Sequence, residues 1–161
     1  MKETFEYIIK KASDFSKDEV DLFKKTVIEA GEVSEATFDG LIAKNPTLIF
    51  IPNTLKIEAV GALKIPNDHY KLNVFTQAQS PESQNEFEFE LGWIVSLIPG
   101  NGKKLTRILS SYRSNIYATV RQENEIMKHI LTINGFIKSG NKYKSNRNDY
   151  YLELYIRKHA D

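Results

Sequence analysis

The sequence predicts a single α/β domain in which a mixed β-sheet carries helices on its faces. Its second half alternates short apolar strands with amphipathic helices, which is typical of strands joined by helical crossovers. The chain has 161 residues, enough for one hydrophobic core but too few for two. We therefore expect one domain over residues 1–161, with the order β-α-α-β-β followed by β-α-β-α-β-β.

The first expected elements are a strand and two helices. Alternating apolar residues predict the strand over residues 4–10. Ser16 and Glu19 have the spacing of a capping box, so a helix should begin there and end at Gly31. Ser34 is the expected cap of a second helix.

A hairpin and a loop complete the first half. Apolar runs over residues 47–51 and 57–65, separated by Pro52-Asn53-Thr54, predict two strands around a turn. Residues 76–86 are rich in Gln, Ser, Asn and Glu and contain a proline, so we expect a mobile loop there.

The second half supplies the remaining strands and helices. Residues 87–96 should form a strand with Leu91 and Trp93 on one face and Glu88 and Glu90 on the other. The other expected elements are a helix after residues 99–104, a strand over 115–121, a helix over 124–133, and two closing strands over 136–144 and 150–157.

Composition excludes several classes of function. The 22 basic and 21 acidic residues give a net charge of +1, so no overall field attracts nucleic acid or a membrane. The chain has no cysteine, which excludes a disulfide, a thiolate metal site and a thiol nucleophile. Its three histidines lack ligand spacing, so we expect no metal. With no signal-peptide pattern and no membrane-spanning apolar run, we expect a cytoplasmic protein.

The strongest chemical signal is the strand-to-helix junction at Gly100-Asn101-Gly102-Lys103-Lys104. Glycines allow a sharp turn and a close approach of a ligand to the backbone. The free amides at the start of a helix attract anions, and two lysines add positive charge. The junction fits neither the phosphate-binding P-loop nor the dinucleotide fingerprint. It predicts either an anion site or a plain turn between strand and helix.

This junction and the segments around it resemble the GNAT N-acetyltransferases. The family's central motif is a strand, a loop of the form Arg/Gln-x-x-Gly-x-Gly/Ala and a helix. The segments that are similar to family elements are residues 90–95, 100–105, 116–121 and 151–154, together with Asn124 and Gly135-Phe136. The resemblance covers residues 87–158 and depends on the order and spacing of separate elements.

The resemblance implies a fold and a cosubstrate. The fold would be a mixed, mostly antiparallel sheet of about six or seven strands, flanked by about four helices. The sheet would be splayed between its fourth and fifth strands, and acetyl-CoA would lie in that gap.

The resemblance also implies which residues bind acetyl-CoA. Backbone groups of Ile94, Val95 and Leu97 would pair with its pantetheine arm, and the Asn124 side chain would bond the same arm. The residues whose amides would hold the pyrophosphate are Gly100, Asn101, Gly102, Lys103 and Lys104.

Two positions depart from the family pattern. Leu97 stands where the loop motif has Arg or Gln if the glycines are aligned; alternatively, the loop is a few residues short between Val95 and Gly100. Either way one phosphate contact is missing, and Lys103 or Lys104 would replace it. Leu131 stands where the family often has a tyrosine that gives a proton to the CoA thiolate. Tyrosines of the closing strands could supply this proton or simply pack in the core: Tyr143, Tyr150 and Tyr151.

Glutamates on the strand before the junction are the candidate bases. A carboxylate can accept the proton of an attacking amine, directly or through water. Glu90 is the first choice and Glu88 the second, because both lie on one strand face beside the expected gap. The other interpretation is that they form the solvated face of an amphipathic strand.

The sequence therefore predicts an acetyl-CoA-dependent N-acetyltransferase that acts on a primary amine of a small molecule or peptide. The alternative is a non-catalytic protein of the same fold that binds CoA or a protein or nucleic-acid partner. Basic residues among the C-terminal tyrosines favour nucleic acid only weakly, because strand edges are often rich in lysine. A homodimer through the last strands is a further expectation from the resemblance.

Overall fold

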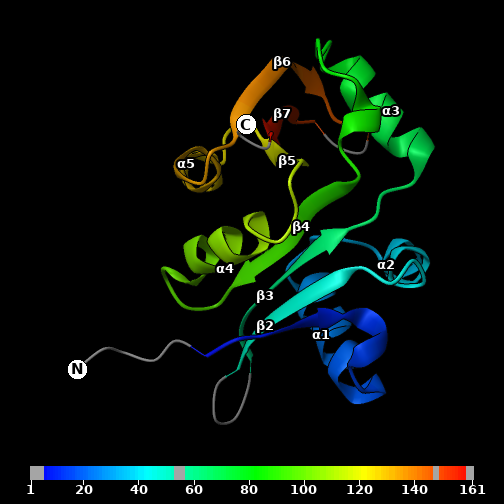
Figure 1. The fold of residues 1–161 in the computed structure, drawn as a ribbon, viewed down its shortest axis with the longest axis vertical. Helices are drawn as coiled ribbons and strands as arrows, with labels where there is room; N and C mark the ends of the chain where they lie inside the picture. Colours follow the sequence, from blue (N-terminus) through cyan, green and yellow to red (C-terminus); the bar gives the residue numbers. More distant parts are fainter. Residues whose placement is uncertain (1–5, 53–56, 147–148, 159–161) are drawn as a thin grey trace.

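The computed structural model describes residues 6–52, 57–146 and 149–158. Within these ranges the chain forms five α-helices and one seven-stranded sheet with the strand order β1-β2-β3-β4-β5-β7-β6 (Figure 1). The strands are β1 Ile8–Lys11, β2 Thr47–Pro52, β3 Ile57–Lys64, β4 Phe89–Ser96, β5 Ile116–Arg121, β6 Ile137–Lys144 and β7 Tyr151–Arg157. The helices are α1 Lys17–Glu29, α2 Glu35–Ile42, α3 Asp68–Gln77, α4 Asn101–Ser110 and α5 Glu125–Ile133.

The sheet is antiparallel except where β4 meets β5. These two strands run parallel and pair only through Phe89 with Ile116 and Glu90 with Tyr117. Among the described residues, β4 has no strand partner on its β5 side beyond Glu90, so the two strands part there (Figure 1). The mostly antiparallel sheet and the split between its fourth and fifth strands are confirmed.

Three groups of buried side chains show how the helices cover the sheet. On one face, α4 and α5 bury Leu109 and Leu131 against the central strands. On the other face, α1 and α2 cover β2 to β4 with Phe23 and Phe38, whereas α3 covers the β5–β7–β6 half with Phe75 (Figure 1). The second face therefore has a seam between two sets of helices, and this seam lies over β4 and β5.

The first two helices begin as their sequences predict. Ser16 accepts a hydrogen bond from the backbone of Glu19, whose carboxylate accepts one in return from the Ser16 backbone, so the capping box is complete. Ser34 caps α2 by accepting from the backbone N–H of Thr37. Such caps satisfy backbone donors that the first helical turn leaves free. The turn expected after β2 falls mainly outside the described residues.

Helix α3 is the element that the sequence pattern does not predict. Its buried face combines Val74 and Phe75 with Lys71, and this buried lysine breaks the apolar periodicity by which helices are recognised. The Lys71 ammonium donates to the backbone oxygen of Phe87 at 3.0 Å, which compensates for its burial. The expected loop at residues 76–86 therefore begins in the last turn of α3, and it ends in a 3-10 turn at Gln84–Glu86.

A β-bulge in β4 changes which side chains share a face. Val60 and Ala62 of β3 are two positions apart, but their partners on β4, Val95 and Gly92, are three positions apart. Trp93 takes up the extra residue with a left-handed φ of 53°. The strict alternation predicted for this strand is therefore wrong beyond Gly92. Leu91 packs under α4, but Trp93 packs on the opposite face with α1 and α2.

Part of the segment after α3 is held against the end of the chain. Ser80 and Ser139 share a hydrogen bond of 2.6 Å between their hydroxyl oxygens, and Lys158 forms an ion pair with Glu82.

In the part of the chain that the structure describes, none of the helices has the length and apolar character of a membrane span.

Candidate active site

Glu90 lies at the fork where β4 and β5 part. It belongs to the last pair of residues that joins the two strands, opposite Tyr117. Its side chain is only 3% exposed, although a carboxylate is costly to bury without partners. Burial contradicts the interpretation that Glu90 belongs to a solvated strand face. Glu88, the second candidate base, is exposed and precedes the first residue of β4.

Lys64 provides the charge that opposes Glu90. It is the last residue of β3, directly across the sheet from Glu90, and its Nζ lies 2.7 Å from Glu90 Oε1. The same ammonium lies 5.4 Å from the centre of the Trp93 ring, close enough for a cation–π contact. The Lys64 side chain is 15% exposed, so the ion pair is largely removed from water.

Gly92 leaves the room that Lys64 occupies. A Cβ atom at this position would lie 2.6 Å from Cε and 2.9 Å from Nζ of Lys64, closer than nonbonded atoms approach. The sequence predicts a bulge or a close backbone approach near this glycine. The bulge is present one residue later, and it is a lysine side chain that passes over Gly92.

Three tyrosines surround the same carboxylate. The Tyr70 hydroxyl, from α3, donates to Glu90 Oε2 at 3.1 Å. The hydroxyls of Tyr117 on β5 and Tyr143 on β6 are buried, and neither forms a hydrogen bond of normal geometry with the described residues, although Tyr117 lies close enough to Glu90 to interact with it. Buried polar groups are nearly always paired, so two unpaired hydroxyls mark a place that can bind a further polar group.

The charge of Glu90 acts on all three tyrosines. It raises the pKa of Tyr70 far above the usual range, with burial as a second cause. Burial is the main cause that raises the pKa of Tyr117 and Tyr143, and the Glu90 carboxylate adds to it. All three hydroxyls therefore stay protonated at neutral pH and can act as hydrogen-bond donors.

The glycine–lysine junction forms the start of α4, at the far end of β4. Gly100 has a left-handed φ of 92°, and within the described part of the chain no side chain caps this helix. Lys103 and Lys104 are exposed in the first turn, whereas Asn101 is buried and its Nδ2 donates to Glu58 Oε2 at 3.4 Å. The backbone N–H groups of Asn101 and Lys104 already donate to the carbonyl oxygens of Ile98 and Gly100. The other amides of the first turn and the two cationic side chains have the character of an anion site.

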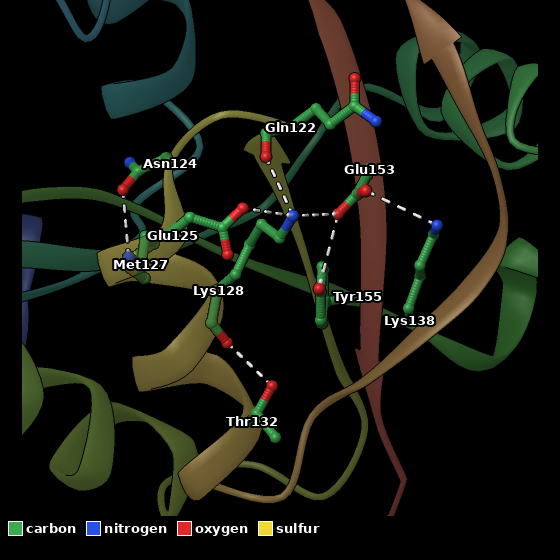
Figure 2. Close-up of polar contacts among 9 residues, drawn as sticks. All are labelled: Gln122, Asn124, Glu125, Met127, Lys128, Thr132, Lys138, Glu153 and Tyr155. Carbon is green, nitrogen blue, oxygen red and sulfur yellow. Dashed lines mark hydrogen bonds and ion pairs between the residues drawn. The ribbon is translucent and has the colours of Figure 1, made fainter.

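The other predicted cofactor residues lie along the same strand and at the start of α5. Ile94 and Val95 follow the bulge on the open part of β4, and Leu97 is exposed after the strand. Asn124 caps α5 by accepting from the backbone N–H of Met127 at 3.0 Å (Figure 2). Leu131 is the fully buried residue of α5 and has no polar atom in its side chain, so it offers no acid to a thiolate.

A second buried glutamate lies on the α5 face of the sheet. Glu153 of β7 accepts the ammonium of Lys128 from α5 at 3.3 Å and that of Lys138 from β6 at 3.5 Å (Figure 2). Tyr155 donates to the same carboxylate at 3.5 Å, and Lys128 also donates to the backbone oxygen of Gln122 at 2.9 Å. This cluster satisfies its own members and joins α5 to β7 and β6.

Sequence reasoning found Glu90 but missed Lys64 and Tyr70. Lys64 ends a strand 26 positions earlier (90 − 64), and only the β3–β4 register places it opposite Glu90. Tyr70 belongs to the helix that the pattern did not predict. The described residues contain no cluster of three or more His, Cys, Asp or Glu that could hold a metal ion.

The whole fold is similar to those of solved acyltransferases. No protein-family model and no curated protein sequence matches the chain significantly. An acyl-CoA N-acyltransferase from Pseudomonas aeruginosa matches with a TM-score of 0.66 and 15% identity, over 96% of this chain and 99% of that one. A GNAT-family acetyltransferase from Bacillus cereus matches with a TM-score of 0.63 and 14% identity, over 97% and 99% of the two chains.

A third similar structure is the ribosomal-protein-S18-alanine N-acetyltransferase from Escherichia coli. It matches with a TM-score of 0.62 and 14% identity, over 97% of each chain. At these identities the comparisons establish the fold. The chain has the GNAT fold, which confirms the fold that its sequence resemblance implied.

Proposed function

We propose that this protein is an acyl-CoA-dependent N-acyltransferase that transfers an acetyl group to a primary amine. The observation that carries the proposal is the buried carboxylate of Glu90 at the fork between β4 and β5. Such a carboxylate is suited to accept a proton from an amine in a site that excludes water. The acyl- and acetyltransferases among the structural neighbours support the same class of reaction.

The cosubstrate is proposed to lie along the open edge of β4. Backbone groups of Ile94 and Val95 and the carbonyl oxygen of Leu97 would pair with its pantetheine arm, as an added strand pairs with a sheet edge. The Leu97 N–H already donates to the carbonyl oxygen of Glu58 at 2.8 Å. The amides of residues 100–104 would hold its pyrophosphate, since the uncapped start of α4 is accessible to an anion. Asn124 uses its side-chain oxygen in the cap of α5, and its amide N–H groups would bond the pantetheine.

The proposed reaction transfers one acyl group to the acceptor nitrogen and removes two protons from it. The acceptor ammonium gives a proton to Glu90, its nitrogen bonds the acyl carbon, and the carbon–sulfur bond breaks. The nitrogen loses its second proton as it becomes an amide, and the sulfur leaves with the electron pair and takes up that proton. Glu90 returns the first proton to water. The raised pKa values of Tyr117 and Tyr143 make their hydroxyls poor acids for this step.

The proposal is tested by following thiol release from acetyl-CoA in the presence of a panel of primary amines. Glu90→Gln should lower turnover by about 100-fold or more, the usual contribution of a general base. Glu88→Gln is the matched control, because this glutamate is two positions away but exposed, and its turnover should stay within about twofold of wild type. Full turnover in Glu90→Gln would contradict the proposal.

The non-catalytic alternative has two observations in its favour. The candidate base is already ion-paired with Lys64, and the position of the usual acid holds the buried Leu131. This alternative predicts that CoA and acetyl-CoA bind without turnover of any amine. Calorimetric titration with both ligands, combined with the thiol assay, separates the two functions.

A further inference from the structure

We propose that Lys64 is itself an acyl acceptor, so that the protein acylates its own ε-amine at the fork between β4 and β5. The proposal depends on the proposed function, because it uses the same acyl-CoA and the same base. It adds a modification site that an assay of external amines would not reveal.

The position of the Lys64 amine carries the inference. Its Nζ lies 2.7 Å from Glu90 Oε1, so a primary amine already occupies the place where an acceptor must give up its proton. An intramolecular acceptor needs no binding step, and a held amine reacts as if it were present at very high concentration.

The path of the Lys64 side chain brings the amine toward the open part of β4. The chain crosses Gly92, where the missing Cβ leaves room for Cε and Nζ, and the ammonium reaches the Trp93 ring at the bulge. Residues 94–97, the proposed place of the pantetheine arm, follow directly. The amine therefore lies between the candidate base and the segment proposed to hold the thioester.

The surroundings of Glu90 also suit the acylated state. Acylation removes the charge of Lys64, and a buried carboxylate would then lose its only described cationic partner. Tyr70 already donates to this carboxylate, and Tyr117 and Tyr143 hold buried hydroxyls without a partner among the described residues. Two such donors could turn to a carboxylate that has lost its lysine, because hydrogen bonds stabilise the charged form.

The acylation of Lys64 needs no reactant other than acyl-CoA. A proton passes from the Lys64 ammonium to the Glu90 carboxylate, and the freed nitrogen bonds the acyl carbon. The carbon–sulfur bond breaks, and the sulfur leaves with the electron pair. It takes up the second proton, which the nitrogen loses as the amide forms, and Glu90 returns the first proton to water. The products are an amide on Lys64, free CoA thiol and one proton.

Two other lysines of the chain serve as internal controls. Lys128 contacts the buried carboxylate of Glu153 at 3.3 Å and is 18% exposed, close to the 15% of Lys64, but it lies on the α5 face. Lys71 is buried on α3 and donates to a backbone oxygen. Neither amine lies against Glu90, so neither should be acylated at a comparable rate.

The test is mass spectrometry of the full chain after incubation with acetyl-CoA and no other amine. We expect one acetyl group, placed on Lys64 by peptide fragmentation, with at least a tenfold excess over Lys71 and Lys128. Lys64→Arg, which keeps the charge, should abolish this acetylation, and Glu90→Gln should slow it at least tenfold. Lys128→Arg should leave its rate unchanged.

The contrary outcomes separate the inference from the proposed function. Turnover of an external amine with no acetyl group on Lys64 would overturn the inference and leave the proposed function intact. Neither turnover nor acetylation would overturn both. Equal acetylation of Lys64 in folded and urea-unfolded protein would show ordinary chemical reactivity and would also overturn the inference.

Discussion

Two buried glutamates, each in contact with a lysine, lie on opposite faces of the same sheet and differ in what surrounds them. Glu153 has two lysines and a tyrosine hydroxyl, and Lys128 reaches a further backbone oxygen (Figure 2). Glu90 has one lysine and one hydroxyl, with two more buried hydroxyls nearby that lack a partner among the described residues. A buried charge pair whose partners are complete holds elements together. A buried charge pair that has unused hydrogen-bond donors beside an open strand edge can bind a substrate.

The largest expected difference comes from neutralising each glutamate. Glu153→Gln should cost about 2 kcal/mol of unfolding free energy, below the usual figure for a broken buried pair because Lys138 can reach water. It should leave turnover within about twofold of wild type. Glu90→Gln should also lower stability, but its turnover should fall by about 100-fold or more. Urea unfolding measures the loss of stability, and thiol release measures turnover. Equal turnover in the two variants would show that Glu90 is no more catalytic than Glu153.

The start of α4 can be compared in the same way with Gly31, a second glycine with left-handed backbone, which follows α1. Gly100 and Gly31 both have a left-handed φ, at 92° and 76°, and neither has an atom within 4 Å of a built Cβ. Glutamate at either position should cost about 1–2 kcal/mol of stability. Only Gly100→Glu should weaken acetyl-CoA binding, by about tenfold or more, because it places a negative charge beside the phosphates. Calorimetry measures the acetyl-CoA affinity of both variants. Equal affinities would show that the cosubstrate does not bind at the start of α4.

Much of the fold can be predicted from the sequence because its signals are local. The capping serines of α1 and α2 and the strand–glycine–helix order around Gly100 each depend on neighbouring residues. The bulge could be predicted only approximately. Gly92 indicates a bulge or a close backbone approach in this strand, but the alternation of the strand does not show that Trp93 is the extra residue. The partners of Glu90 could not be predicted, because strand register and an unrecognised helix place Lys64 and Tyr70 beside it.

A smaller difference in stability is expected when a tyrosine of each cluster is replaced by phenylalanine. Tyr155→Phe removes a donor to Glu153 and should cost about 0.5–1 kcal/mol, the net value of a long hydrogen bond. Tyr117→Phe removes a buried hydroxyl without a described partner, so stability at pH 7 should stay the same or rise by up to about 1 kcal/mol. Chemical unfolding measures both, and a loss of more than about 1 kcal/mol in Tyr117→Phe would show that the hydroxyl is bonded.

The tyrosines at the fork should also weaken the fold in alkali. In the unfolded chain a tyrosine ionises near pH 10, whereas the raised pKa of Tyr117 keeps it protonated in the folded state. The folded state then holds the extra proton, so stability is complete below about pH 10 and falls as the pH rises above it. Tyr117→Phe should reduce this fall by about 1 kcal/mol per pH unit, measured by urea unfolding between pH 9 and 11. An unchanged slope would mean that Tyr117 ionises as an exposed tyrosine does.

The proposal that acetyl-CoA binds at the fork between β4 and β5 is tested most directly by hydrogen–deuterium exchange of the full chain with and without saturating acetyl-CoA. If the cosubstrate lies along the open edge of β4 and at the start of α4, exchange should slow over residues 94–104. Peptides covering residues 151–157, which contain Glu153, should exchange at the same rate in both states. Protection confined to other segments, or no protection at all, would contradict a cosubstrate site at this fork.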